Sequence, residues 1–306
     1  MKFAGRMNSV LFQNNNLMQS IKILQEIPEI SHVELNFPEH VNNKNIFEIK
    51  NSLCDKKVSG IAIRFREKFI SGEFTNPDPS LSQLAEKICF DAIDACRTLG
   101  GEVVTIWLGY DGFDYPFQLD YENKWNDIIH TFQNIADYGK DLKISIEYKP
   151  YEPRAYSMLD SIGLTLLAMN EINRENMGVT VDFCHMLMKK ENPAYSLALA
   201  ARNNKLFGVH LNDGYREMDN GLIFGSINIP QALEFLYYLK KYAYDGVIFF
   251  DSFPIRENAV EEIRTNIQTY KRLSEMIDAV GLQKISKVIN KQNGISSHEL
   301  VLDMLR

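Results

Sequence analysis

Four residues with metal-binding side chains each follow a short apolar run. In chain order they are Glu147 after KISI, Asp182 after MGVTV, His210 after LFGV and Asp251 after GVIFF, separated by 35, 28 and 41 residues. Such runs are typical of buried parallel strands, whose carboxyl ends meet at one edge of a sheet or one face of a barrel. Three carboxylates that meet at one point repel one another unless a cation joins them. The pattern therefore predicts a divalent metal site with these four residues as ligands.

Two further residues extend this ligand set toward a second ion. His185 lies three positions after Asp182, on the same face of a helical turn, so Asp182 could bridge two ions while His185 binds the second. Asp219, in the loop after His210, could reach the second ion, and Asp213 is an alternative for that role. Oxygen and imidazole ligands without thiolate favour Mn²⁺, or alternatively Mg²⁺ or Co²⁺. The structural alternatives are that Asp182 is a helix N-cap and that His210 is a core residue.

The residues around these ligands suggest what the metal would hold. Lys149 stands two positions after Glu147, so both lie on one side of an extended segment, and the ammonium could polarise a substrate oxygen. Trp107 ends another apolar run, and an aromatic wall beside carboxylates suits the apolar face of a sugar. Arg64 directly follows a further run and is also assigned to substrate binding. A structural ion pair between Glu147 and Lys149 and a core position for Trp107 are the competing interpretations.

Patterns typical of strands and helices alternate along the whole chain. The expected strands are 2–7, 32–35, 59–63, 103–107, 143–146, 178–181, 207–209 and 247–250. A helix is expected from Pro79, with Asp78 as N-cap, to Leu99, and Asn192-Pro193 marks another helix start. Eight alternations without a linker favour one (β/α)₈ TIM barrel over residues 1–278. A helical tail over residues 279–306 could pack on a neighbouring subunit.

The composition limits the classes of function. The chain has 306 residues and a net charge of −7, which argues against binding to nucleic acid. Its four cysteines show no CxxC spacing, so reduced thiols are expected. The start of the chain lacks the apolar segment of a signal peptide, and no apolar run approaches the roughly 20 residues that span a bilayer. A soluble cytoplasmic protein without membrane contact is therefore expected.

These motifs resemble those of the xylose isomerase-like superfamily of TIM barrels, and within it the metal-dependent aldose–ketose isomerases. EYKPYEPR at 147–154 is similar to the EPKPNEPR stretch of xylose isomerases, and GEFTNPDPS at 72–80 with LGGEVVTIWLGYDG at 99–112 resembles their third and fourth strand region. LFGVHLN at 206–212, with histidine in place of aspartate, is closer to rhamnose isomerases, and YDGVIFFDSFP at 244–254 resembles the eighth strand. The resemblance extends to about residue 278.

The resemblance implies a sugar isomerase that interconverts an aldose and a ketose with one or two divalent ions. The first ion would be bound by the four strand-end residues, and the second by Asp182, His185 and Asp219. The catalytic residues would be Lys149, Glu147 and Asp251. The sugar would be contacted by Trp107 and Asn36, alongside Arg64. A homo-oligomer, either a dimer or a tetramer, is also expected.

The sequence departs from the isomerase pattern at three places. Asn36 stands where xylose isomerases carry a histidine that assists ring opening, with His40 farther along. Gly221 stands where the second metal site normally has another aspartate, so this site should bind more weakly than the first. An aspartate introduced at position 221 should then tighten the second site. The C-terminal arm of xylose isomerases is much reduced, so a different oligomer contact is expected.

Other functions are possible for the same pattern. A ketose 3-epimerase or an inosose isomerase would use one ion, with Glu147 and Asp251 as an acid–base pair on opposite faces of the sugar. An endonuclease-IV-type phosphodiesterase would need more histidines for three zinc ions and a basic groove, whereas this acidic chain has six histidines. A barrel that only binds sugar would not need this ligand set. His185 and Asp219 favour a second ion and therefore isomerisation.

Overall fold

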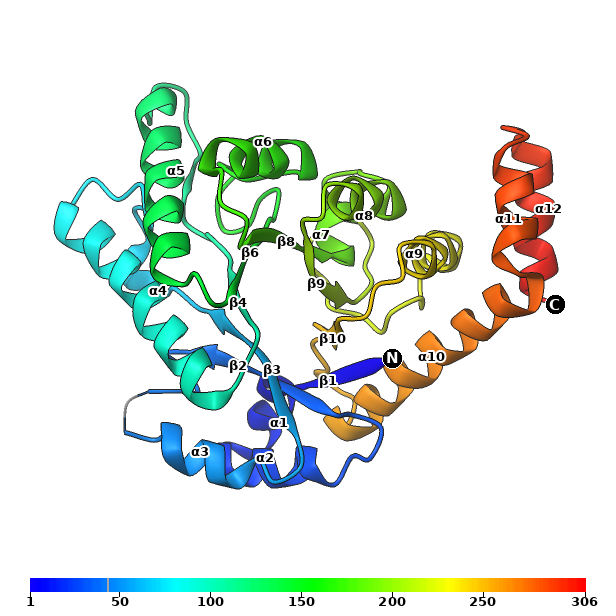
Figure 1. Ribbon diagram of the computed structural model, residues 1–306, viewed down its shortest axis with the longest axis horizontal. Helices are drawn as coiled ribbons and strands as arrows, with labels where there is room; N and C mark the ends of the chain where they lie inside the picture. The colour runs from blue at the N-terminus through cyan, green and yellow to red at the C-terminus, as the bar shows by residue number, and fades with distance from the viewer. Residues whose placement is uncertain (43) are drawn as a thin grey trace.

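The computed structural model describes residues 1–42 and 44–306. Within these residues, eight parallel strands close into a barrel in the spatial order β1-β10-β9-β8-β6-β4-β3-β2. Helices surround the barrel, and both β1 and β10 at its seam are visible near the centre of Figure 1. Each barrel strand corresponds to one of the eight predicted apolar runs. The predicted (β/α)₈ fold is confirmed.

The barrel strands are short and mostly buried. Their bounds are β1 Lys2–Arg6, β2 His32–Phe37, β3 Lys57–Ile63, β4 Val103–Ile106, β6 Lys143–Glu147, β8 Met177–Asp182, β9 Leu206–Leu211 and β10 Val247–Phe250. Every residue of β8 is buried, as expected for a parallel strand whose two faces are both covered. In the strand register, Asp182 pairs with His210 and Glu147 pairs with Thr180. The last residues of β6, β8 and β9 therefore lie close to one level of the barrel.

Several helices begin at capping signals that the sequence carries. They are α1 Met7–Asn14, α2 Leu17–Gln25, α3 Ile46–Ser52, α4 Pro79–Leu99, α5 Tyr121–Tyr138, α6 Ile162–Ile172, α7 Phe183–Met188, α8 Pro193–Arg202, α9 Ile229–Lys241, α10 Ala259–Val280, α11 Leu282–Ile289 and α12 Gly294–Met304. The Asp78 side chain accepts the backbone N–H of Ser80 at the start of α4, and Asn192 accepts that of Tyr195 at the start of α8. Both predicted helix starts are confirmed.

The loops that follow β3, β4 and β6 are joined to one another. Two short strands inside them, β5 Gly112–Phe113 and β7 Tyr156–Ser157, form an antiparallel pair. The buried carboxylate of Asp111 accepts the three successive backbone N–H groups of residues 73–75, at 2.8, 2.9 and 3.0 Å. Since these loops lie at the carboxyl ends of their strands, the contacts give that end of the barrel a fixed rim.

The C-terminal helices extend from one side of the barrel. Figure 1 shows α10 leading away from the strands to α11 and α12, which lie beside each other at the edge of the molecule. Ile285 of α11 and Met304 of α12 are buried in the apolar core. Among the helices of the described residues, none combines the length and the hydropathy needed to cross a membrane.

Candidate metal centre and substrate cavity

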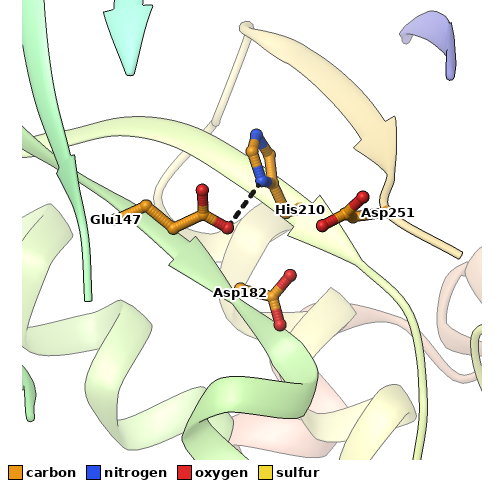
Figure 2. A group of neighbouring side chains, drawn as sticks. All are labelled: Glu147, Asp182, His210 and Asp251. Carbon is orange, nitrogen blue, oxygen red and sulfur yellow. Dashed lines mark hydrogen bonds and ion pairs between the residues drawn. The ribbon is translucent and has the colours of Figure 1, made fainter. Parts of the chain in front are cut away.

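The four predicted ligands meet at the carboxyl end of the barrel. Glu147 and Asp182 are the last residues of β6 and β8, His210 lies in β9, and Asp251 directly follows β10. All four are buried, and one ligand atom of each lies within 4.8 Å of those of the others. Figure 2 shows their side chains converging on a common point. The strand-end pattern thus located a compact group of potential ligands.

His210 is electrostatically tied to two glutamates. Its Nδ1 atom lies 3.0 Å from a carboxylate oxygen of Glu147, and its Nε2 atom lies 3.7 Å from Glu34 inside the barrel. Burial disfavours the charged form of His210, but Glu147 and Glu34 raise its pKa well above the ordinary value. Burial likewise disfavours ionised Glu147, yet His210 lowers the pKa of that carboxyl to about 2. The ionised carboxylate needs a cation beside it, either the imidazolium or a metal ion.

Asp182 combines a structural contact with a position in the cluster. One of its oxygens accepts the backbone N–H of His185 at 3.0 Å and caps α7, and the other accepts Nδ2–H of Asn212 at 3.0 Å. Burial raises the pKa of Asp182 to about 7, with His185 opposing the rise and nearby carboxylates adding to it. The N-cap interpretation is therefore correct. It does not exclude metal binding, because a carboxylate oxygen has a second lone pair.

The residues predicted for a second ion lie beside the first group. The Nδ1–H of His185 donates to the backbone oxygen of Tyr148 at 3.0 Å, which turns Nε2 toward Asp219, 3.2 Å away. Metal-binding histidines are commonly oriented by such a bond from the other ring nitrogen. Burial lowers the pKa of His185, but Asp182 and Asp219 outweigh this effect and raise it to about 9.

One carboxylate oxygen of Asp219 is positioned to bind a cation. Its Oδ2 atom contacts both His185 and the Nζ atom of Lys149, the latter at 3.1 Å. Its Oδ1 atom is buried and has no hydrogen-bond partner among the described residues. An unpartnered buried carboxylate oxygen is costly unless a cation or a water satisfies it. The donors of both groups, oxygens with imidazole and no thiolate, fit a hard or borderline divalent ion.

Two neighbouring positions do not add a ligand. Gly221 has a φ of +55°, and a Cβ atom built there would lie 2.3 Å from the ring of Phe253. An aspartate at 221 would therefore require the Phe253 ring to move, which argues against the expectation that it would complete the second site. The carboxylate of Asp213 accepts the backbone N–H groups of Ile227 and Asn228, at 2.9 and 3.0 Å. Its other carboxylate oxygen accepts two further hydrogen bonds, from the backbone N–H of the next residue and from the Asn228 side chain, so both oxygens are fully engaged within the loop and Asp213 is a poor alternative ligand.

A cavity of about 150 Å³ opens beside the two groups. Trp107, Lys149 and Arg64 line it, as do Glu147 and Asp251. The Lys149 Nζ atom and the Arg64 guanidinium lie 5.4 and 5.8 Å from the centroid of the Trp107 ring. These three residues therefore lie next to one another and form one wall of the cavity.

Asn36 is the predicted site residue that the structure does not bring to this wall. It is buried and is not among the lining residues of the cavity. Its backbone N–H donates to Nδ1 of His40 at 2.9 Å, and its side chain lies 3.5 Å from Glu39. The geometry gives no support to a contact between Asn36 and a sugar.

Arg6 is a residue of the site that the sequence reasoning missed. Its Nε atom lies 2.5 Å from Asp251, and its guanidinium stacks 4.6 Å from the centroid of the Phe253 ring. Arg6 ends β1 and lines the cavity. The strand-end rule would have found it if the rule had been applied to basic residues as well as to acidic ones.

The model of a protein family, described as "Xylose isomerase-like TIM barrel", matches residues 30–280. The chain belongs to this family. A xylose isomerase of Thermus thermophilus is 28% identical over 221 residues, which are 69% of this chain and 57% of the relative. A xylose isomerase of Thermus caldophilus is 28% identical over 222 residues, with the same coverage. The chain thus matches somewhat more than half the length of these relatives.

Solved structures of other proteins share the fold over nearly the whole chain. A D-tagatose 3-epimerase-like protein has a TM-score of 0.70 at 22% identity, covering 92% of this chain and 100% of that one. D-psicose 3-epimerase from Clostridium cellulolyticum H10 has a TM-score of 0.72 at 13% identity, covering 90% and 99%. At these identities the likeness concerns the fold alone.

Proposed function

We propose that this chain is a metal-dependent sugar isomerase that interconverts an aldose and a ketose. The main observation that supports the proposal is that two groups of possible metal ligands lie side by side. The buried cluster of Glu147, Asp182, His210 and Asp251 lies directly beside His185, Asp219 and Lys149. A site with a single ion does not need His185 and Asp219. The similarity to xylose isomerases supports the reaction class.

In this proposal, the side chains around the cavity bind the sugar, stabilise its carbonyl oxygen and move a proton at carbon. A divalent ion held by the cluster would supply Lewis-acid chemistry toward the substrate oxygens. The ammonium of Lys149 faces the cavity and would stabilise a carbonyl oxygen that gains negative charge. Glu147 and Asp251 reach the same cavity and are candidates for moving a proton at carbon. The ring of Trp107 would pack against the apolar face of the sugar.

The proposal also includes the identity of the metal ion, the cellular compartment and the oligomeric state. Mn²⁺ suits a site of three carboxylates and one imidazole, with Mg²⁺ and Co²⁺ as alternatives. Three of the four cysteines are buried and all four are free thiols, which supports a reducing compartment such as the cytoplasm. A homo-oligomer, dimer or tetramer, remains part of the proposal.

A ketose 3-epimerase, or an inosose isomerase, with one ion is the second candidate. The observation that favours it is the ring of Phe253, which occupies the space beside Gly221 where a further ligand of the second ion would stand. In this case the second group would be an ion-pair network, with Asp219 balanced by His185 and Lys149. Glu147 and Asp251 would then act as acid and base on opposite faces of the sugar.

Metal analysis combined with a sugar panel tests these proposals. The protein is stripped with EDTA, reloaded with Mn²⁺, Mg²⁺ or Co²⁺, and incubated with aldoses and ketoses whose products are followed by NMR. Two ions per chain with aldose–ketose conversion would support the isomerase. One ion with inversion at C3 would support the epimerase. If the reloaded protein converts no sugar of the panel, both proposals are wrong.

A further inference from the structure

The cavity is lined by three arginines for which the proposed reaction gives no role. The carboxylates of the metal cluster come from β6, β8 and β10 on one side of the barrel. Three arginines also line the cavity: Arg6 ends β1, which pairs with β10, and Arg64 and Arg66 lie directly after β3. The strands β1, β2 and β3 are neighbours in the sheet. The three guanidinium groups therefore share one quadrant of the barrel mouth.

A buried histidine, His40, lies beside this part of the cavity wall. His40 follows β2, is buried and contacts Asn8, another residue of the cavity wall. Burial is the main cause that lowers its pKa to about 4, and Arg6, Arg64 and Arg66 each add to the decrease while Glu39 opposes it. His40 therefore stays neutral near pH 7 and adds no positive charge beside these arginines.

Among the three, Arg64 differs in having no anionic partner. Arg6 is paired with Asp251, and Arg66 is paired with Glu39 at 2.6 Å. No carboxylate of the described residues lies within 4.0 Å of the Arg64 guanidinium, and its buried Nε atom has no hydrogen-bond partner there. A guanidinium that is partly buried and unpaired is unfavourable unless a ligand pairs with it.

A neutral sugar would satisfy this quadrant poorly. Sugar hydroxyls can accept hydrogen bonds, but they leave the charge of Arg64 unbalanced, and they are equally well bound by the uncharged side chains that sugar sites ordinarily use. A phosphate or a carboxylate instead matches the planar fork of a guanidinium and forms short, charge-assisted hydrogen bonds. The centroid of the Trp107 ring lies 5.8 Å from the Arg64 guanidinium and 5.4 Å from Nζ of Lys149, so the ring connects Arg64 with the proposed reaction centre.

We infer that the substrate is an acidic sugar that carries a phosphate or a carboxylate, and that Arg64 binds this group with Arg6 and Arg66 beside it. The inference rests on the proposed function, because it assigns the rest of the same substrate to the metal cluster. It makes Arg64 a specificity-determining residue, and it predicts that neutral sugars are poor ligands.

The test compares matched probes that differ in one group. The affinities of the Mg²⁺-loaded protein for glucose, glucose 6-phosphate and glucuronate are measured by isothermal titration, which requires no turnover. At least one charged probe should bind at least tenfold more tightly than glucose, and which one does so tells phosphate from carboxylate. The preference should fall below threefold in Arg64→Gln and be partly retained in Arg64→Lys.

One control variant and two outcomes decide the interpretation. Arg272→Gln removes one charge from an exposed position on α10 and should leave the preference unchanged. A preference that came from the metal ion rather than from Arg64 would survive Arg64→Gln, and that result would overturn the inference. Equal affinity for all three probes, or no binding of either charged probe, would overturn it as well.

The inference and the proposed function can fail separately. If the charged probes bind through Arg64 but no sugar, neutral or acidic, is converted, the anion site stands and the isomerase proposal is wrong. If neutral sugars are isomerised and no Arg64-dependent preference exists, the isomerase proposal stands and the acidic substrate is wrong.

Discussion

Lys149 is the residue whose replacement best separates chemistry from metal binding. Its Nζ atom contacts Asp219 at 3.1 Å and Glu152 at 3.0 Å, and neither contact belongs to the four-residue cluster. We expect Lys149→Met to lower kcat by on the order of 10²-fold, as for the loss of a preorganised partner of a developing oxyanion. Steady-state kinetics and metal analysis should show this loss with the first ion still bound.

The matched control for this variant is Lys143→Met. Lys143 is the exposed first residue of the same strand, β6, at the opposite end of the barrel, so kcat should stay at the wild-type value. If Lys149→Met raised KM and left kcat unchanged, Lys149 would be a binding residue only.

Asp182 is the residue that joins the two proposed ions. Asp182→Asn should weaken binding of both, because it removes a negative charge that each would share. The fold should survive, since asparagine is also a good N-cap for α7. Titration of Mn²⁺ into the apo protein would measure the loss, with Asp91→Asn, on the exposed face of α4, as the control. Unchanged affinity at both sites would rule out the bridging role.

For single residues, the sequence predicted the four potential metal ligands better than it predicted the residues around the cavity. Glu147, Asp182 and His210 are positioned by the strands that carry them, so the pattern of apolar runs was sufficient. Asn36 lies in β2, but its contacts are made by the loop that follows, which has no comparable pattern. The packing of Phe253 on Arg6 and beside Gly221 depends on two loops meeting in space, and no local signal predicts it.

At the scale of elements, the loops after β9 and β10 constrain each other at Gly221. The backbone N–H of Phe253 donates to the carbonyl of Gly221 at 2.7 Å, so the two loops cannot easily separate. We expect Gly221→Asp to destabilise the protein by about 1–3 kcal/mol, as overpacking commonly does, without tightening a second ion. Urea unfolding and Mn²⁺ titration would measure the two effects.

Gly163→Asp serves as the control because it introduces the same side chain without crowding. A Cβ atom at Gly163, near the start of α6, meets no heavy atom within 4 Å, so its effect should stay within about 0.5 kcal/mol. A tighter second ion in Gly221→Asp, with stability unchanged, would contradict the steric argument.

The elements themselves were largely predictable. Eight buried runs and strong capping signals such as Asp78-Pro79 locate the barrel strands and the helix starts without tertiary information. The pair of β5 and β7 was missed because each strand has two residues, too few for a period to be recognised. Such strands form because the loops around them are fixed, here by the hydrogen bonds of Asp111 to residues 73–75.

At the scale of the whole molecule, the barrel rim buries a histidine in its neutral form. The pKa of His40 is lowered by burial to about 4, against 6.5 for the unperturbed group. Because the folded value is the lower one, His40 stabilises the fold above pH 6.5, and this contribution is lost as the pH falls toward 4. It amounts to roughly 3 kcal/mol, at 1.36 kcal/mol per pKa unit.

Replacement of this histidine should therefore make the protein less sensitive to acid. The difference in unfolding free energy between pH 7 and pH 4.5, measured with urea, should be smaller in His40→Gln than in the wild type. His298→Gln, at an exposed position of α12, is the control and should behave as the wild type does. An equal loss of stability in His40→Gln and the wild type would contradict the assignment.

The net charge of the chain did not predict the basic side chains that line its cavity. The net charge of −7 predicted only that nucleic acid is not a partner. Four basic side chains nevertheless line the cavity, Arg6, Arg64, Arg66 and Lys149. They come from β1, from the loop after β3 and from the loop after β6, and only the closed barrel brings them together.

The most direct test of this account is to locate the metal. A crystal of the protein soaked in Mn²⁺ would be measured at a wavelength where manganese scatters anomalously. We expect a peak at about 2 Å from one ligand atom each of Glu147, Asp182, His210 and Asp251. A weaker second peak between His185 and Asp219 would support the isomerase over the epimerase. If no peak lay among the four cluster residues while Mn²⁺ bound elsewhere, the proposed metal site would be wrong.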